Sequence, residues 1–317
     1  MKKTKKLLSV LLSGVLIAIL LAGCGSSSGS STPSASKSET ASNAENTKSD
    51  TSATEETKPV ETTTAPEIKF EEVTVVDNDE CVIKITDIDA DNMWGYTLKV
   101  YLENKNTEKT YMYSVVSASV NGIEVDPLFA NEVAAGKKAN KEMNFMDSSL
   151  KENGIEFTDI ALTFRVYDSN DWSADEVVRE TVHVYPLGEE NATIFVREAQ
   201  ASDQVLIDNE KCKVTVIGTE NDSIWGYTLK LYLENKADSS IMFSVGDVSV
   251  NGYMIDPFWA KSVSAGNVAF SDMSFSTSAF EENGIETVED IELTIRAYND
   301  EDYSANDYAK ETVTINP

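Results

Sequence analysis

The sequence predicts an all-β protein in which residues 68–317 form two tandem antiparallel β-sandwiches. Three observations lead to this prediction. Apolar residues recur at every second position in short runs, which is the spacing of half-buried strands. Turn signals separate these runs at intervals of roughly 8–12 residues, as in sandwich folds. The second half of the region repeats the first at an offset of about 131 residues, so the same fold is expected twice.

Before this region, residues 1–23 have the composition of a secretory signal. Four lysines precede an apolar run from Leu7 to Leu21, and a small-residue site closes the run. The run has about 15 residues, whereas a spanning helix requires roughly 20. Ser9, Ser13 and Gly14 also interrupt it. The alternative of a transmembrane anchor is therefore disfavoured.

The end of the signal, Leu21-Ala22-Gly23-Cys24, resembles the lipobox of bacterial lipoproteins. The resemblance implies that Cys24 is diacylated, that residues 1–23 are removed and that Cys24 becomes the first residue of the mature chain. Two or more acyl chains give lasting membrane attachment. We therefore expect a lipid-anchored protein on the extracytoplasmic face of the cell membrane.

Residues 24–67 are rich in Ser, Thr and Glu and contain few large apolar side chains, so they are predicted to form a disordered tether. The whole chain is strongly acidic, with a net charge of −28. Nucleic acid is excluded as a partner, because its binding relies on Lys and Arg at phosphates. Acidity also keeps a chain soluble, which is the simplest explanation of the charge.

The duplication is visible in four motifs, and each repeat of about 120 residues is long enough for its own core. Trp94-Gly95-Tyr96-Thr97-Leu98-Lys99 recurs as Trp225-Gly226-Tyr227-Thr228-Leu229-Lys230, Ser119-Val120-Asn121-Gly122 as Ser249-Val250-Asn251-Gly252, Asp126-Pro127 as Asp256-Pro257, and Glu152-Asn153-Gly154 as Glu282-Asn283-Gly284. The predicted domains are the signal (1–23), the tether (24–67), repeat 1 (68–187) and repeat 2 (188–317).

Within each repeat the pattern predicts seven or eight short strands. Runs such as Ile160-Leu162-Phe164-Val166 alternate with polar residues, and each Asn-Gly pair predicts a tight hairpin turn with positive φ at both residues. A short helical segment is expected at residues 148–153 and again at 278–283. Each is followed by a glycine that ends it, Gly154 or Gly284.

These signatures resemble the tandem immunoglobulin-like β-sandwich repeats of lipoproteins from Gram-positive gut Clostridia and their relatives. Those proteins also carry Trp-Gly-Tyr, Asn-Gly and Asp-Pro-Phe signatures in tandem units. The resemblance covers residues 68–317. It implies an immunoglobulin-like fold for each repeat and no activity, because the activity of that family is not established.

Cysteine and histidine usage limits the chemistry. Cys81 and Cys212 occupy equivalent positions at the start of alternating runs, so we expect two buried free thiols instead of a disulfide. The only histidine, His183, is expected on the solvent side of a strand. A His-dependent triad or a multi-His metal site is thus excluded.

One acidic segment is a candidate cation site. Asp87, Asp89 and Asp91 alternate like the first ligands of a calcium loop. The EF-hand pattern then requires Gly at the sixth position and Glu at the twelfth, where this chain has Asn92 and Leu98. A looser Ca²⁺ site stays open beside the alternative of a solvated acidic loop. No other cofactor is expected.

Aromatic residues supply the remaining candidates. Trp172 and Tyr303 occupy the same place in an acidic loop of each repeat, which suggests a platform for a sugar ring or a partner side chain. The alternative is an aromatic ring folded over the sandwich edge. Phe258 and Trp259 are adjacent, so both cannot point inward along a strand, and at least one is a candidate contact residue.

Other aromatic residues receive structural interpretations. Trp94 and Trp225 are predicted to lie in the core or to cap one end of a sandwich. Alternation places a second group on outward strand positions, where neighbouring members would form cation–π stacks. The members are Tyr101, Arg165, Tyr167, Tyr232, Arg296 and Tyr298.

No nucleophile elbow, phosphate loop or metal-ligand cluster is present in the sequence, so no enzymatic activity is expected. The sequence favours a membrane-anchored, non-catalytic module at the cell surface that binds a protein or glycan partner or acts as a spacer. A calcium-dependent adhesion or sensing module is the alternative, and a carboxylate-based hydrolase is a distant one.

Overall fold

The computed structural model describes residues 68–317, apart from residues 147, 172, 224, 225 and 258. The lipobox residues Leu21, Ala22, Gly23 and Cys24 therefore lie outside the described residues, and so do Trp172, Phe258 and Trp225. The described part of the chain falls within one compact unit. None of its helices is long and apolar enough to cross a membrane.

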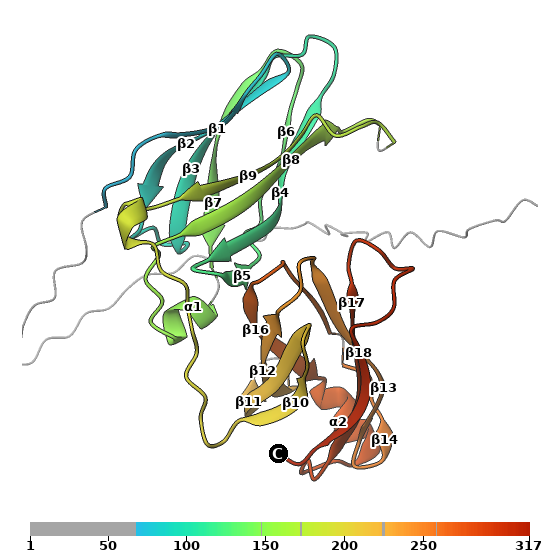
Figure 1. The fold of residues 1–317 in the computed structure, drawn as a ribbon. Helices are drawn as coiled ribbons and strands as arrows, with labels where there is room; N and C mark the ends of the chain where they lie inside the picture. The colour runs from blue at the N-terminus through green and yellow to red at the C-terminus, as the bar shows by residue number, and fades with distance from the viewer. Residues whose placement is uncertain (1–67, 147, 172, 224–225, 258) are drawn as a thin grey trace, which may run out of the picture. The chain divides into compact units, whose positions relative to one another are not determined.

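Repeat 1 folds into two antiparallel sheets, as predicted (Figure 1). The first sheet has the order β1-β2-β3-β7. Its strands are β1 (Val73–Asp77), β2 (Cys81–Asp89), β3 (Tyr96–Asn104) and β7 (Lys138–Phe145). In the second sheet β9-β8-β4 continues to β5 and β6, which both pair with β4. Its strands are β4 (Tyr111–Val120), β5 (Ile123–Val125), β6 (Ala130–Val133), β8 (Ile160–Asp168) and β9 (Val178–Val184).

Repeat 2 has the same design. The first sheet, β10-β11-β12-β16, contains β10 (Gln204–Asp208), β11 (Cys212–Ser223), β12 (Gly226–Asn235) and β16 (Val268–Phe275). The second contains β13 (Ile241–Val250), β14 (Tyr253–Met254), β15 (Ala260–Val263), β17 (Ile291–Asn299) and β18 (Ala309–Ile315). In both repeats the order is the Greek-key arrangement of an immunoglobulin-like sandwich. One additional strand, β1 or β10, lies at the edge of the first sheet.

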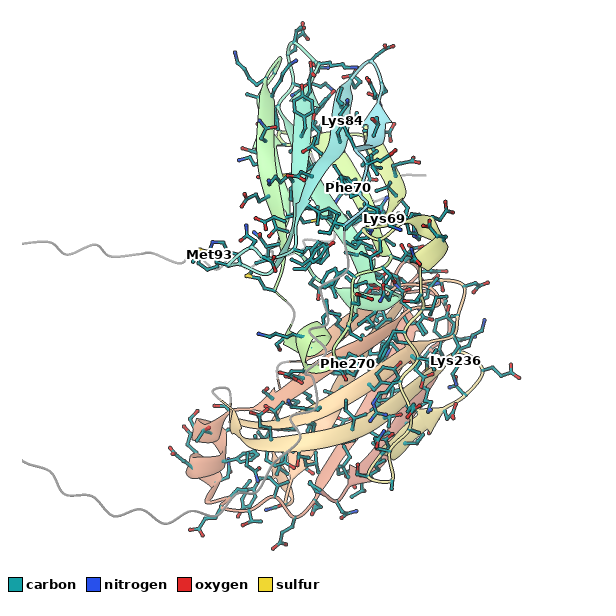
Figure 2. All side chains as sticks on the ribbon, turned by 90° about the vertical axis from the view of Figure 1, so that its left-hand side faces the viewer. Lys69, Phe70, Lys84, Met93, Lys236 and Phe270 are labelled. Atoms are coloured by element: carbon teal, nitrogen blue, oxygen red, sulfur yellow. The ribbon has the colours of Figure 1, made fainter. Side chains whose placement is uncertain are left out.

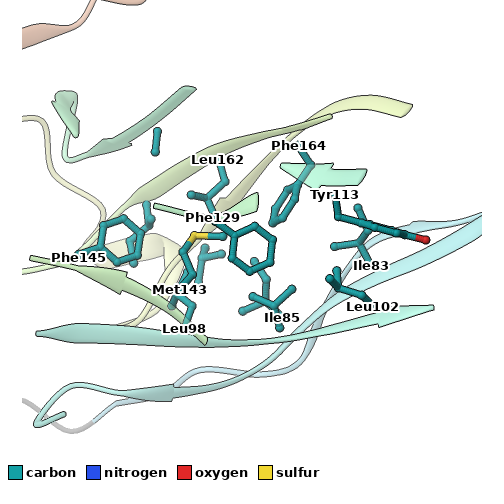
Figure 3. Close-up of a cluster of buried hydrophobic side chains, with 14 of the residues drawn as sticks. Ile83, Ile85, Leu98, Leu102, Tyr113, Phe129, Met143, Phe145, Leu162 and Phe164 are labelled. Carbon is teal, nitrogen blue, oxygen red and sulfur yellow. The ribbon is translucent and has the colours of Figure 1, made fainter. Parts of the chain in front are cut away.

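Each repeat has its own core between its two sheets. In repeat 1 the inward side chains of β8 (Ile160, Leu162, Phe164 and Val166) are fully buried, which confirms the predicted alternation. Phe164 packs edge-on against Phe129 at a ring-centroid distance of 6.1 Å, and Figure 3 shows both among the apolar side chains of the core. A separate cluster built from residues between Ile207 and Ile315 forms the core of repeat 2.

The two thiols and the histidine lie where the sequence places them. Cys81 and Cys212 are buried and free, each in the core of its own repeat. Burial raises the pKa of each thiol to about 11. His183 lies on the exposed side of β9, where its Nδ1 atom is 2.8 Å from Asp159 Oδ1.

A β-bulge changes which face of β2 looks inward. The pairing of β2 with β3 shifts register between Ile85 and Asp87. As a result Ile88 turns toward the core and Asp87 toward solvent. β11 carries the same irregularity between Val216 and Gly218.

The predicted turns and helix ends are confirmed. Asn121 and Gly122 have φ of 52° and 80°, and Asn251 and Gly252 have 50° and 81°. These values fit two-residue hairpin turns that match the twist of the strands. The helices α1 (Ser148–Glu152) and α2 (Thr277–Asn283) end before left-handed glycines, Gly154 and Gly284.

A short parallel contact joins the two repeats within the compact unit. β5 pairs with β16 through Ile123 and Val268, and the Val268 amide donates to the Gly122 carbonyl at 2.9 Å. Beside it Glu124, only 6 % exposed, accepts hydrogen bonds from the Ser264 amide (3.1 Å) and from Asn267 Nδ2 (2.9 Å). Burial raises the pKa of Glu124, and these hydrogen bonds oppose that shift.

The prediction that Trp94 lies in the core is wrong, whereas Tyr232 faces outward as predicted but is covered. Trp94 is 58 % exposed, because it belongs to the loop between β2 and β3 and not to the core. Met93, beside it, points away from the sandwich (Figure 2). Tyr232 points away from the core of repeat 2, as alternation predicts, yet it is only 6 % exposed. Its outward face is covered by Phe270 (centroids 5.3 Å apart) and by Arg197, which precedes repeat 2's first strand.

Candidate functional site

Repeat 2 carries a polar surface cluster of Arg296, Tyr298, Tyr303 and Asp307, which we call the repeat 2 aromatic–arginine cluster. Arg296 and Tyr298 are two positions apart on β17, so both side chains stand on the same outward face. The Arg296 guanidinium lies 4.2 Å from the centre of the Tyr298 ring. This is the predicted cation–π stack.

An acidic partner fixes this stack. Arg296 Nε donates to both carboxylate oxygens of Asp307, at 2.9 and 3.0 Å, and Nη2 lies 2.9 Å from Oδ1. The hydrogen bond from Arg296 holds the pKa of the Asp307 carboxyl below its usual range. A guanidinium held in this way keeps one orientation, so the Tyr298 ring beneath it is also restrained.

Tyr303 extends the cluster into solvent. It lies in the loop between β17 and β18, and its ring is 5.8 Å from that of Tyr298. The side chain is 70 % exposed, so it is not folded over the sandwich edge. Asp302 Oδ1 accepts hydrogen bonds from the Ser304 amide (3.0 Å) and hydroxyl (2.6 Å), which form a tight turn around Tyr303. The ring is thus presented by an ordered loop.

Repeat 1 contains the same arrangement, which we call the repeat 1 aromatic–arginine cluster. Arg165 lies 4.4 Å above the Tyr167 ring, and Glu176 takes the place of Asp307. Arg165 Nε lies 2.7 Å from Glu176 Oε1 and forms an ion pair with it. Arg179 supplies a second cation, donating from Nε to Glu176 Oε2 at 2.8 Å.

The loop of this cluster also matches. Asp171 Oδ1 accepts from the Ser173 amide (3.0 Å) and hydroxyl (2.7 Å), the same turn that Asp302 forms. In sequence, Trp172 stands between these two residues as Tyr303 stands between Asp302 and Ser304. The placement of Trp172 lies outside the described residues, whereas the turn that carries it is defined.

Both clusters border one hollow of about 1020 Å³. Its wall includes Arg165 and Arg179 of repeat 1 and Tyr303 of repeat 2. Acidic and hydroxyl groups complete it, among them Asp300, Glu301 and Ser262. The hollow is therefore lined mainly by hydrogen-bonding groups with one exposed aromatic ring, and it offers neither a deep apolar pocket nor one sign of charge.

The other aromatic candidate is placed differently. Trp259 is partly buried against the core of repeat 2, and its indole Nε1 donates to Ser271 Oγ at 2.9 Å. It occupies the position that Phe129 has in repeat 1. Phe258 lies outside the described residues. Its sequence counterpart Leu128 is 85 % exposed.

The three candidate calcium ligands are not brought together. Asp87 belongs to β2 and forms an ion pair with Lys99 at 2.7 Å, which lowers the pKa of the Asp87 carboxyl. Asp89 ends the same strand and accepts from Asn92 Nδ2 at 3.2 Å, and Asp91 lies in the following turn. Within the described residues no three acidic, histidine or cysteine side chains gather in a way that could hold a metal ion.

Sequence reasoning found the Arg and Tyr members of the clusters but missed their acidic partners. Glu176 and Asp307 lie at equivalent positions just before the last strand of each repeat. An acid retained there beside an Arg-x-Tyr motif was the available signal. Strand alternation alone could not find it, because both acids lie in loops.

Comparisons with known proteins add little to this description. No family model matches the sequence, and no curated protein matches it. Among solved structures, a YadV chaperone is similar with a TM-score of 0.25 and 12% identity, over 74% of this chain and 100% of that one. Red sea bream transglutaminase gives a TM-score of 0.21 and 11% identity, over 76% of this chain and 31% of that one. Likenesses this low bear on neither fold nor function.

Proposed function

We propose that this protein is a lipid-anchored, non-catalytic module of the extracytoplasmic membrane face that binds polysaccharide through its two aromatic–arginine clusters. The lipobox, the polar tether and the two tandem sandwiches support the anchored arrangement. The single observation that carries the binding role is the repetition of one exposed cluster in both repeats, with the same turn and the same Arg–Tyr stack.

The chemistry of the clusters suits a sugar polymer. A pyranose ring presents a face of C–H groups that packs on an aromatic ring, and its hydroxyls bond to carboxylates and guanidinium groups at the edge. Tyr303 offers the ring, while Asp300 and Glu301 lie beside it. Aromatic residues that keep one orientation serve as anchors in binding surfaces at low entropic cost.

Two clusters in one chain also favour a polymeric ligand. A polysaccharide presents the same unit many times, so one chain can engage it at two places. The second contact is then intramolecular, and the combined affinity exceeds that of either cluster alone. A single small sugar would gain nothing from the duplication.

Tyr303→Ala is expected to weaken polysaccharide binding by about tenfold, the loss typical for truncation of an anchor side chain. Trp172→Ala is expected to act similarly, and the double variant should bind more weakly than either single variant because both contacts of the bivalent complex are then weakened. The measurement is retention of the full chain on immobilised cell-wall polysaccharides, compared by affinity electrophoresis.

Trp94→Ala is the matched control, because Trp94 is also an exposed aromatic in a loop but belongs to neither cluster. It should bind like the wild type. Equal binding by wild type and Tyr303→Ala would contradict the proposal, and so would wild-type failure on every polysaccharide. Retention by surface proteins alone would assign the clusters to a protein partner instead.

The anchor is tested separately. Cys24→Ser removes the sulfur that the lipid requires, so the protein is expected to leave the membrane fraction and to lose incorporation of labelled fatty acid. Cys81→Ser changes a thiol buried in the core of repeat 1 and should leave lipid labelling unchanged. Continued labelling of the Cys24→Ser variant would show that the acyl chains are attached elsewhere.

A further inference from the structure

Each of the two strands that form the β5–β16 contact has an equivalent strand in the other repeat. β14 of repeat 2 corresponds to β5, and β7 of repeat 1 corresponds to β16. In the described part of the chain β14 pairs only with β13, and β7 pairs only with β3. Both are therefore sheet edges whose backbone groups are open to a further strand.

We propose that β14 of one copy docks along β7 of a second copy, which repeats between chains the parallel contact that joins the two repeats within one chain. In the internal contact the Val268 amide donates to the Gly122 carbonyl. In the contact between copies the Lys138 amide takes the first role and the Gly252 carbonyl the second. The inference goes beyond polysaccharide binding and does not depend on it.

The side chains at this edge are exposed and apolar. Tyr253 is 48 % exposed and Met254 is 69 % exposed. Their counterparts in repeat 1 are buried: Ile123 belongs to the core of repeat 1 and pairs with Val268, and Glu124 accepts hydrogen bonds from repeat 2. An exposed pair of large side chains on a two-residue edge strand is thus left at the position that repeat 1 uses for docking.

The residues that face each other across the contact differ in pairs between the internal contact and the proposed contact between copies. Within the chain Glu124 accepts from the Ser264 amide and hydroxyl. Between copies the corresponding pair is Met254 and Ala134, so a polar pair becomes an apolar pair. The internal contact also carries an ion pair between Asp126 and Lys261. Its counterpart is Asp256 with Asn131, a carboxylate facing an amide donor.

Charge is complementary across the proposed contact. Repeat 1 has Lys137, Lys138 and Lys141 at and beside β7, where the equivalent residues of repeat 2 are Asn267, Val268 and Ser271. All three lysines are exposed, and Lys138 also reaches Glu103 at 3.2 Å. A basic edge of this kind stands out in a chain with a net charge of −28.

The opposite end carries acids. The loop before β17 lies against the β13–β14 turn, because the Glu289 and Asp290 amides donate to Asn251 Oδ1 at 2.8 and 3.2 Å. Glu289 replaces Thr158 of repeat 1, and Asp256 adds an exposed carboxylate two residues after β14. Basic and acidic ends favour head-to-tail encounter and oppose head-to-head pairing.

Such an interface uses two different surfaces of each copy, so it is heterologous. Contacts of this type extend into rows or filaments when the rotation does not close. On a membrane the expected product is a row of neighbouring anchored copies. The proposal therefore predicts association that grows with concentration and weakens with salt.

The test is sedimentation velocity of the lipidated full chain in detergent over a range of concentrations. Wild type is expected to associate. Met254→Lys places a lysine opposite Lys137 and should weaken association about tenfold, and Lys137→Glu should also weaken it. The double variant Met254→Lys with Lys137→Glu restores an opposite-charge pair and should recover association. Lys151→Glu, the same charge change on α1, is the control and should behave as wild type.

A second measurement distinguishes loss of association from misfolding of the charge variants. Met254→Cys in one tagged copy and Ala134→Cys in another are expected to form a disulfide between copies on the membrane, since Cys81 and Cys212 are buried. A wild type that stays monomeric at every concentration overturns the proposal. So does unchanged association of Met254→Lys, or a double variant as weak as the single ones.

Discussion

Gly226→Ala is expected to lower the free energy of unfolding of repeat 2 by about 2–6 kcal/mol, combining backbone strain with overpacking. Gly226 has φ of 98°, a region that L side chains rarely adopt. A Cβ at this position would also lie well inside 3.0 Å of the Phe275 carbonyl oxygen on the neighbouring strand. Backbone cannot move away as a side-chain tip can. Urea unfolding followed by tryptophan fluorescence measures the loss.

Gly95→Ala should produce a similar loss in repeat 1, because Gly95 has φ of 95° and a Cβ there would strike the Phe145 carbonyl oxygen. This explains the glycine of the repeated Trp-Gly-Tyr motif. Gly136→Ala is the matched control: its φ is 67° and no atom lies within 4 Å of the added Cβ. Only the left-handed strain of about 1–2 kcal/mol applies there. Equal losses at Gly136 and Gly226 would refute the steric argument.

Asn235→Ala is expected to cost about 2–4 kcal/mol, because it leaves several buried backbone groups without partners. Asn235 ends β12 and is only 3 % exposed. Its Nδ2 atom donates to the carbonyls of Ser239 (2.9 Å), Val263 (2.8 Å) and Ser264 (3.0 Å). Its Oδ1 atom accepts from the Ala237 amide at 2.8 Å. The side chain thus holds the loop after β12 against the end of β15.

Asn104→Ala should have the same effect in repeat 1, where Nδ2 donates to the Lys109 and Val133 carbonyls, each at 2.8 Å. Asn283→Ala is the control, because Asn283 donates one hydrogen bond to the Ala279 carbonyl at the end of α2 and is only partly buried. It should cost about 0.5–1.5 kcal/mol. Thermal and urea unfolding compare the three variants. A loss at Asn235 no larger than that at Asn283 would mean that water replaces the missing amide.

The parts of the fold that depend on local pattern could be predicted from the sequence. Alternation in β8 placed Phe164 in the core, and the Asn-Gly pairs placed both hairpin turns. These features follow from the two-residue period of a strand and from the tolerance of Asn and Gly for positive φ. Because the sequence is duplicated, each strand or turn predicted in one repeat is also predicted at the equivalent position of the other.

Features that depend on distant partners could not be predicted. The bulge after Ile85 changes which side chains of β2 point inward, and no residue type at that position predicts a bulge. Alternation correctly pointed Tyr232 away from its own core, but Arg197 and Phe270 cover it from outside. Glu124 reads as a surface residue until Ser264 and Asn267 are seen beside it. In each case the deciding contact is remote in sequence.

The candidate site was predictable to the same extent. Arg296 and Tyr298 follow from strand alternation, and Tyr303 from its place among acids. The restraint that Asp307 places on Arg296 required the folded loop. The candidate calcium ligands show the converse, since the spacing of Asp87 and Asp89 suggests a loop but the chain places both in a strand.

The buried cysteines have a practical consequence. Each repeat holds one thiol in its core, and a pKa of about 11 leaves very little of it as the reactive thiolate at neutral pH. A thiol reagent can reach Cys81 or Cys212 only when the surrounding sandwich opens. The rate at which each one is modified therefore reports the opening free energy of its own repeat. The two modification rates therefore distinguish unfolding of one sandwich from unfolding of both.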